Sequence, residues 1–172
     1  MGVVDVLRTI QDHVPNPLDP LGTLFGVVVD TNIATSSTIA VPTSYTRAML
    51  DYARANPLDG ALLLVGLGRN PVYHSGGWIL SVQTGAAAMT LDRHIFAKAP
   101  LSIGTYVHEM VHVGQYGVTG RTGFLVSYFG LSAMTIAKRL IARENLDVMQ
   151  SSPHEDQAYN LERRFLSWRA SA

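Results

Sequence analysis

Two histidines and a glutamate, in the sequence HEMVH at positions 108–112, are the residues of this chain best suited to binding a metal ion. Residues four apart on a helix share one face at a separation of about 5–6 Å, so His108 and His112 can bind one zinc ion together. Glu109 lies beside that face, where its carboxylate can accept a proton from a water held by the metal. The spacing therefore predicts a zinc site in which Glu109 is the general base.

The residues around this motif indicate that its helix is buried. Apolar side chains stand on nearly every side of it: Leu101, Ile103, Val107, Met110, Val111 and Val113. A buried helix must find partners for the side chains of His108, Glu109 and His112, and a metal ion binds two of them at once. An ordinary helix with two polar histidines is the alternative, and the expected burial favours zinc over it.

A zinc site needs a third protein ligand, and the absence of cysteine leaves histidine, aspartate or glutamate to provide it. The metzincin pattern does not continue after the motif, because Gln115 and Val118 occupy the positions where that pattern has glycine and histidine. We therefore expect a carboxylate from a following helix. Glu144 and Glu162 each adjoin arginine residues, which predicts that both lie on the solvated surface.

Glu155 is the remaining glutamate, and the residues around it allow two interpretations. Ser152, with Pro153 at the first helical position and Glu155 three positions on, forms the pattern of a capping box, which by itself favours a structural role. The other interpretation is that Glu155 binds zinc, with His154 and Asp156 as rival ligands on the same turn. The residues alone leave these alternatives open.

The order of the elements predicts an α+β fold, because a mixed first half is followed by helices. The expected helices cover residues 2–13, 44–55, 101–116, about 120–144 and 153–169. Strands are expected at 78–83 and 87–96, joined as a hairpin at Thr84 and Gly85, while 24–41 is expected as strand or loop and 61–67 as strand or helix. We thus expect a small mixed sheet or hairpin packed on the helix that carries HEMVH, with two further C-terminal helices.

The length of 172 residues predicts a single domain over residues 1–172, with 1–42 as a candidate N-terminal arm or extension. Thirteen basic residues balance thirteen acidic ones, so the net charge gives no reason to expect nucleic acid as a partner. The uncharged run at 122–137 is shorter than the about 20 residues of a spanning helix, so we expect a buried helix rather than membrane contact. The first residues lack the apolar core of a secretion signal, which predicts a cytoplasmic protein.

Three segments together resemble gluzincin-type zinc metallopeptidases, specifically the short bacterial metallopeptidase-like domains associated with extracellular contractile injection systems. They are MTLDRHIF at 89–96, VHEMVHVGQY at 107–116 and SPHEDQAY at 152–159. GFLVSYF at 123–129 is similar to the helix that links the last two segments in related short families. The resemblance covers about residues 89–160, and residues 1–60 resemble no family that we can name.

The resemblance implies a zincin-like fold and the hydrolysis of peptide bonds in a protein or peptide substrate. It implies one Zn²⁺ per chain bound by His108, His112 and Glu155, with Glu109 as the general base that activates the water. The resemblance therefore favours Glu155 as a zinc ligand over Glu155 as part of a helix cap. The resemblance also implies that strand 87–96 is an exposed edge able to pair with an extended substrate, and that the protein is cytoplasmic or exported as cargo of an injection system.

One departure from the family pattern concerns the residue four positions after Glu155. Many gluzincins have an acidic residue there, which holds a ligand histidine by its second nitrogen, whereas this chain has Tyr159. Asp156 and Asn160 are candidate substitutes. The departure supports an alternative function, that of a zinc-binding domain of weak catalytic activity that docks or recognises a protein partner.

A peptidase of this kind also needs a hydrogen-bond donor for the developing oxyanion. Four residues near the motifs are candidates for this role: Tyr106, Tyr116, His154 and Tyr159. The remaining histidines are assigned no function. We expect His74 in a loop, His94 on the surface of a strand and His13 at the end of a helix.

Overall fold

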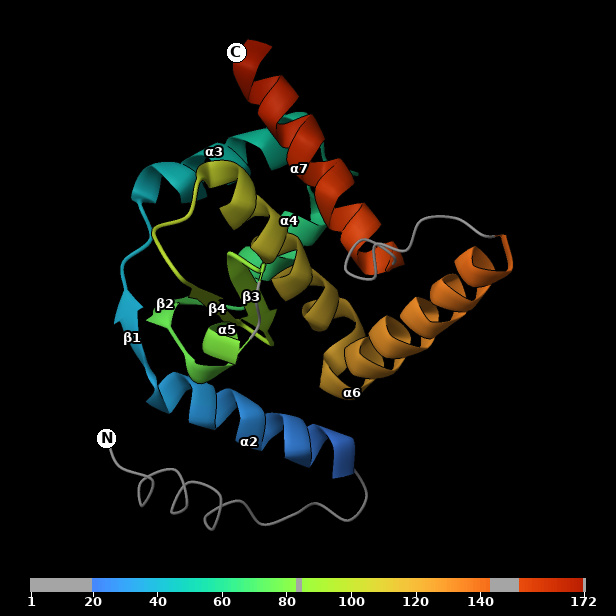
Figure 1. The fold of residues 1–172 in the computed structure, drawn as a ribbon. Coiled ribbons are helices and arrows are strands. Elements are labelled where there is room, and N and C mark those ends of the chain that lie inside the picture. Colours follow the sequence, from blue (N-terminus) through green and yellow to red (C-terminus); the bar gives the residue numbers. More distant parts are fainter. Residues whose placement is uncertain (1–19, 83–84, 143–151, 172) are drawn as a thin grey trace.

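The computed structural model describes residues 20–82, 85–142 and 152–171, without the side chains of 131–142. In these residues six helices pack around a four-stranded sheet (Figure 1). In chain order the elements are α2 (Pro20–Ala34), β1 (Ser36–Ile39), α3 (Thr43–Ala55), α4 (Ala61–Gly68), β2 (Val72–Gly76), α5 (Trp78–Val82), β3 (Ala88–Leu91), β4 (His94–Ala97), α6 (Ile103–Ala142) and α7 (Pro153–Ser171). The helix expected at 2–13, Thr84 and Glu144 lie outside the described residues.

The sheet is mixed and has the strand order β1-β2-β4-β3. β1 and β2 are antiparallel, β2 and β4 are parallel, and β3 and β4 are antiparallel. Thr90 of β3 pairs with Ile95 of β4, so these two side chains face one side of the sheet while their neighbours face the other. The expected α+β class with a small mixed sheet is confirmed, and β3 is one edge of that sheet.

The alternation along the strands divides the core into two clusters. The cluster that contains Ile95 also contains buried residues of α6 and α7, among them Val107, Met110, Leu161 and Phe165. The cluster on the opposite face contains buried residues of α2, α5 and the sheet, among them Phe25, Val29, Leu80, Leu91 and Phe96. The first cluster therefore holds both α6 and α7 against one side of the sheet.

α6 is broken at Gly120, whose φ of 71° lies in the left-handed region that glycine adopts without strain. The break separates two helical arms, which confirms the helices expected at 101–116 and about 120–144 (Figure 1). The first arm is buried, and Phe124 at the start of the second arm lies 5.0 Å from His154 of α7, measured between ring centroids. Among the described residues, no helix combines the length and the apolarity that a membrane crossing requires.

Glycines allow α4 to lie very close to the first arm of α6. A Cβ added at Gly114 would lie 2.2 Å from the backbone oxygen of Leu62, and one at Gly66 would lie 2.7 Å from that of Met110. The segment 61–67, expected as strand or helix, is the helix α4. This close approach fixes the position of the helix that carries HEMVH.

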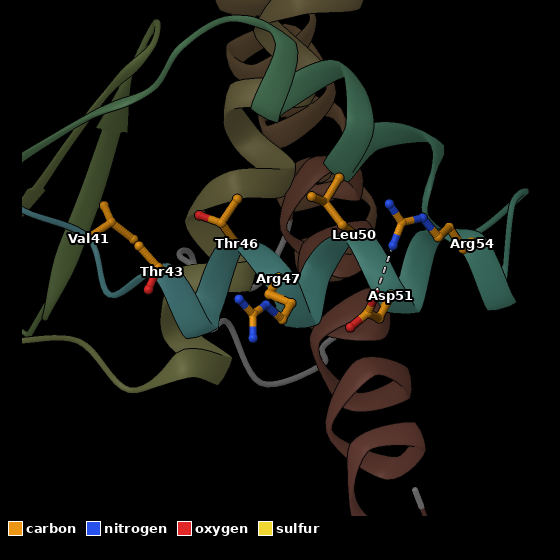
Figure 2. A pocket seen from close by; sticks show the side chains of 7 residues that line it. All are labelled: Val41, Thr43, Thr46, Arg47, Leu50, Asp51 and Arg54. Carbon is orange, nitrogen blue, oxygen red and sulfur yellow. Dashed lines mark hydrogen bonds and ion pairs between the residues drawn. The ribbon is translucent and has the colours of Figure 1, made fainter.

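α3 confirms the helix expected at 44–55. Its inner face buries Met49, Tyr52 and Ala53, and Tyr52 packs edge-on against Phe165 of α7. Its outer face is polar and borders an open hollow of about 490 Å³ (Figure 2). The hollow is lined by Val41, Thr43, Thr46, Arg47, Leu50, Asp51 and Arg54.

The strand expected at 78–83 is wrong, because this segment forms the short helix α5. Two side chains, one in α2 and one directly after it, accept its first backbone N–H groups. Trp78 donates its N–H to Oγ1 of Thr35 at 3.0 Å, and Ile79 donates to Oδ1 of Asn32 at 3.1 Å. These partners lie more than forty positions away in the sequence, so no local pattern predicts the helix.

The expected hairpin turn is also misplaced. Residues 87–96, expected as one strand, are divided into β3 and β4 by a turn at Asp92 and Arg93. Asp92 has a φ of 61°, a conformation that aspartate adopts more readily than most residues. Its buried carboxylate binds Arg69 and also Arg121, the latter through Nη2 at 2.8 Å. These ion pairs place the turn where the local sequence did not predict it.

Residues 24–41 were expected as strand or loop, but Pro20–Ala34 forms the helix α2 and only Ser36–Ile39 forms a strand. The hydroxyl of Thr31 donates to the backbone oxygen of Val27 at 2.8 Å, which satisfies a polar group within the helix. Phe25 is buried in the second core cluster. Tertiary packing thus outweighs the low helix propensity of the β-branched residues.

Candidate metal centre

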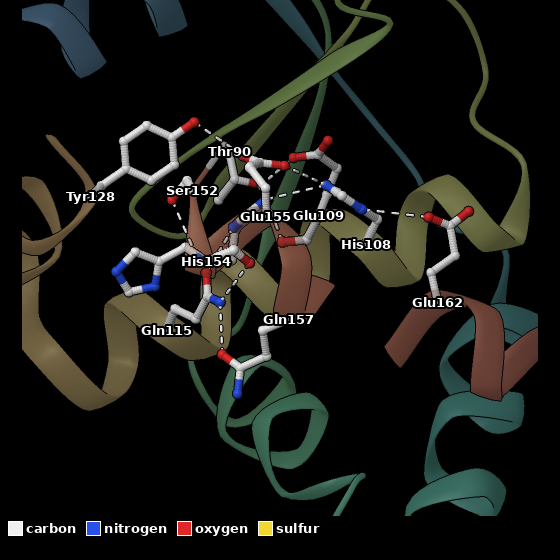
Figure 3. A network of polar contacts seen from close by, with 11 residues as sticks. Thr90, His108, Glu109, Gln115, Tyr128, Ser152, His154, Glu155, Gln157 and Glu162 are labelled. Carbon is white, nitrogen blue, oxygen red and sulfur yellow. Dashed lines mark hydrogen bonds and ion pairs between the residues drawn. The ribbon is translucent and has the colours of Figure 1, made fainter. Parts of the chain in front are cut away.

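Three side chains from two helices converge on one point in the structure. His108 and His112 lie one turn apart on α6, and Glu155 lies in the first turn of α7. The two Nε2 atoms are 3.2 Å apart, Nε2 of His108 is 3.2 Å from Oε2 of Glu155, and Nε2 of His112 is 3.4 Å from Oε1 of Glu155. Figure 3 shows this network of polar contacts.

These separations fit a tetrahedral metal site. Donor atoms that each lie about 2.0–2.1 Å from a tetrahedral zinc ion are about 3.3–3.4 Å from one another. The contacts of 3.2, 3.2 and 3.4 Å are close to that value, with one oxygen of Glu155 facing each histidine. Two imidazole nitrogens and one carboxylate are also a common set of zinc ligands, so the residues present fit the ion.

Gln115 determines which nitrogen of His112 carries the proton. The Nε2 of Gln115 donates to the backbone oxygen of His154 at 3.1 Å and to Oε1 of Gln157 at 2.9 Å. Its Oε1 must therefore be the atom 2.8 Å from Nδ1 of His112, and an amide oxygen can only accept. Nδ1 of His112 is thus protonated when the ring is neutral, which leaves the Nε2 lone pair directed at the site.

The ring of His108 has two further neighbours from α7, Glu162 and Tyr159. Oε2 of Glu162 lies 3.4 Å from its Nδ1, and the ring of Tyr159 lies 4.4 Å away between centroids. The prediction that Glu162 is a solvated surface residue is wrong, because its side chain is only 20% exposed. Asp156 and Asn160, the substitutes suggested by sequence, are both exposed.

Glu109 is buried beside the convergence point and is held by the sheet. Its side chain is 6% exposed, and the hydroxyl of Thr90 on β3 donates to its Oε2 at 2.7 Å. Burial raises the pKa of Glu109, while the charges of His112 and His108 and the bond from Thr90 act against that rise. A carboxylate with a raised pKa is better able to take up and return a proton near neutral pH.

The charges of the site favour a cation at its centre. Burial alone would raise the pKa of Glu155, but its hydrogen bonds to His108 and His112 outweigh burial and hold that pKa well below its usual value. Burial alone would lower the pKa of His112, but the hydrogen bond with Glu155 and the charge of Glu109 raise it. The buried carboxylates thus stabilise a positive charge at His112, and a metal ion satisfies the same demand.

The start of α7 settles how Ser152 and Glu155 are used. Ser152 does cap the helix, since its Oγ accepts the N–H of His154 at 3.2 Å and its backbone oxygen accepts the N–H of Asp156 at 3.0 Å. The carboxylate of Glu155 contacts the two histidines of α6, with Oε2 3.2 Å from Nε2 of His108. The predicted cap by Ser152 is therefore confirmed, whereas the carboxylate of Glu155 is directed at the histidines.

Tyr128 is a site residue that the sequence analysis missed. Its hydroxyl donates to Oε1 of Glu155 at 3.1 Å, and its ring stacks on His154 with centroids 6.1 Å apart. Of the donors expected from sequence, His154 and Tyr159 adjoin the site, whereas Tyr106 and Tyr116 are buried in the two core clusters. Its position in GFLVSYF, the segment that is similar to the linking helix of related families, could have indicated Tyr128 from the sequence.

The two remaining described histidines lie in the sheet. His74 was expected in a loop, but it is 2% exposed on β2. Its Nδ1 lies 3.1 Å from Oγ of Ser36 and its Nε2 lies 3.0 Å from Nδ1 of His94. His94 is half-buried rather than a surface residue.

No protein-family model, curated protein or solved structure matches this chain. The functional argument therefore depends on the geometry of the site.

Proposed function

We propose that this protein is a zinc-dependent metallopeptidase of zincin-like fold, with His108, His112 and Glu155 as the ligands of one Zn²⁺ and Glu109 as the general base. The observation that carries the proposal is the convergence of His108, His112 and Glu155, each of which offers one ligand atom within 4.8 Å of the others, beside the buried carboxylate of Glu109. The contact between Thr90 of the edge strand β3 and Glu109 supports the zincin-like arrangement, because it places a sheet edge beside the general base.

The roles of the individual residues follow from their positions. A bound zinc ion supplies a water of lowered pKa and polarises a substrate carbonyl. Glu109, fixed through Oε2 by Thr90, takes up a proton from the attacking water and passes it to the leaving amine nitrogen. Tyr128, whose hydroxyl donates to Glu155 at 3.1 Å, is the candidate donor to the developing oxyanion, toward which its one proton would turn from Glu155. An extended protein or peptide segment is the substrate class that the edge strand β3 can pair with.

Zinc content tests the metal site directly. We expect about one zinc ion per wild-type chain by elemental analysis and a clear loss in Glu155→Ala. Asp156→Ala is the matched control, because Asp156 is an exposed acidic residue on the same turn and was a rival ligand. Equal loss in both variants, or a wild type that holds no zinc even after zinc is added, would contradict the proposed site.

Hydrolysis of an unfolded protein substrate tests the proposed activity. Glu109→Gln is expected to keep zinc and to lose about 10²–10⁴-fold in kcat, because the amide cannot accept the proton. Tyr128→Phe is expected to keep zinc and to lower kcat with little change in KM. Activity that persists in zinc-loaded Glu109→Gln would remove Glu109 from the role of general base.

The low exposure of the site favours a second candidate function, that of a zinc-binding domain of weak activity that docks a protein partner. The side chains of His108, His112 and Glu155 are only 9%, 8% and 16% exposed. A site this enclosed offers little surface to a substrate. Zinc-loaded wild type with no more hydrolysis than Glu109→Gln would favour this function over peptidase activity.

A further inference from the structure

The Nδ1 nitrogen of His108 is buried and faces away from the three donor atoms. Among the described residues it makes no hydrogen bond of good geometry, and the carboxylate oxygen Oε2 of Glu162 lies 3.4 Å from it. Figure 3 shows Glu162 on the side of the His108 ring opposite Glu155. A neutral imidazole binds a metal through Nε2 only when its proton is on Nδ1, so an acceptor at Nδ1 determines whether His108 can be a ligand.

Gly104 provides the space that the Glu162 carboxylate occupies. Gly104 precedes His108 by one turn of α6, and a Cβ added to it would lie 2.8 Å from Oε1 of Glu162. Glu162 stands seven positions after Glu155, a spacing that returns to the same face of a helix. The same face of α7 therefore directs one carboxylate to each side of His108.

Tyr159 packs on His108 between these two carboxylates along α7. Its ring meets the imidazole at an interplanar angle of 61°, with the centroids 4.4 Å apart. The ring limits the rotation of the imidazole, but it contains no carboxylate to accept the proton of Nδ1. That acceptor has to come from elsewhere on this face.

We propose that Glu162 is the positioning residue that accepts the Nδ1 proton of His108 and so presents Nε2 of His108 to the metal. A small rotation of the Glu162 side chain shortens the 3.4 Å contact to a charge-assisted hydrogen bond. The inference rests on the proposed zinc site and is independent of peptidase activity.

Zinc affinity, measured by competition with a chromophoric chelator, tests the proposal. Glu162→Ala is expected to raise the Kd for zinc about 10–100-fold, and Glu162→Gln to raise it less because the amide oxygen still accepts. Gly104→Ala keeps the charge but displaces the carboxylate, and should raise the Kd in the same direction. Asp156→Asn removes the same charge from an exposed position of α7 and should stay within about twofold of wild type.

A second measurement separates positioning from a general loss of structure. In zinc-loaded protein, where Nε2 of His108 would bind the metal, ¹H–¹⁵N correlations of the imidazole rings should show the Nδ1 proton of His108 shifted downfield and protected from exchange with water in the wild type, and less so in Glu162→Ala. The melting temperature in chelator should be nearly unchanged in Glu162→Gln. A merely structural role would lower that temperature and leave the Nδ1 proton of His108 as it was.

Two outcomes are decisive against the proposal. If Glu162→Ala and Gly104→Ala bind zinc as tightly as the wild type, the positioning role is overturned while the zinc site stands. If the wild type binds no zinc, the proposed function itself fails and the inference fails with it.

Discussion

The side chain of Gln115 makes three hydrogen bonds at the site. It accepts the proton of His112 Nδ1 through Oε1 and donates to the His154 backbone and to Gln157 through Nε2. These three bonds join His112 on α6 to the turn that carries Glu155. The side chain therefore couples the orientation of one proposed ligand to the position of another.

Replacement of Gln115 by leucine should weaken both zinc binding and the fold. We expect a Kd for zinc about 10-fold higher or more, because the His112 ring loses the acceptor that fixes its tautomer. We also expect a loss of about 1–3 kcal/mol in the free energy of unfolding of the metal-free protein, because buried polar partners are left unsatisfied. Zinc titration and urea unfolding in chelator measure the two effects, and a wild-type value in both would contradict the coupling.

His74 and His94, the histidine pair in the sheet, make the stability of the fold depend on pH. Burial, together with the charge of His74, lowers the pKa of His94 to about 4, whereas an unfolded histidine titrates near 6.5. Between these values the unfolded chain binds more protons than the folded one, so the fold loses stability as the pH falls from about 6.5 to about 4. In chelator, His94→Gln should reduce this loss, as measured by urea unfolding at several pH values. An identical pH dependence in both proteins would show that His94 does not titrate in this way.

The residues of the site differ in how far the sequence could predict them. HEMVH is informative because four positions make one turn of helix, so the geometry of His108, Glu109 and His112 is local. Glu162 and Tyr128 come to the site only through the packing of α7 and of the second arm of α6. Next to two arginines, Glu162 has the local sequence of a surface residue, and the space left by Gly104 lets its side chain become half-buried.

At the scale of the elements, the position of α6 depends on its contact with α4. Gly114→Ala would place a Cβ 2.2 Å from the backbone oxygen of Leu62. A backbone atom cannot move aside as the end of a flexible side chain can. We expect a loss of about 1–3 kcal/mol or more in the free energy of unfolding, because the two helices must separate. Gly130→Ala is the control, since an added Cβ there meets no atom within 4 Å. It should be neutral or stabilising by up to about 1 kcal/mol, because alanine favours helix.

Urea unfolding of both variants tests the importance of this contact. Equal stability of Gly114→Ala and the wild type would show that the close approach of α4 and α6 is dispensable. The same variant should also bind zinc more weakly, because the shift of α6 moves both histidines relative to Glu155. Gly130→Ala should keep wild-type affinity.

Elements whose pattern is complete within their own residues were predicted, and elements that depend on distant partners were not. α3 has clear helical spacing, α7 begins after a capping serine, and both were expected. α5 depends on Asn32 of α2 and on Thr35 directly after α2 for its first N–H bonds, so its five residues were mistaken for a strand. The turn between β3 and β4 depends on Arg69 and Arg121, which lie far from Asp92 in the sequence.

At the scale of the whole molecule, the proposed zinc ligands link α6 to the first turn of α7. The same two helices share the core cluster that contains Val107, Leu161 and Phe165. A metal bound by all three ligands therefore adds a cross-link between helices that already pack together. Any ligand that binds the folded chain and not the unfolded one stabilises it by mass action.

Zinc is thus expected to raise the melting temperature of the wild type. At a zinc concentration 100-fold above the Kd the gain is about 2.7 kcal/mol, which corresponds to a rise of roughly 5–11 °C for a chain of this size. Differential scanning calorimetry with zinc and with chelator measures this rise, and Glu155→Ala should show little of it. The rise should shrink at pH 5, because the imidazoles must be neutral to bind the metal. An equal rise in Glu155→Ala would mean that zinc binds elsewhere, and that the link between α6 and α7 does not depend on this carboxylate.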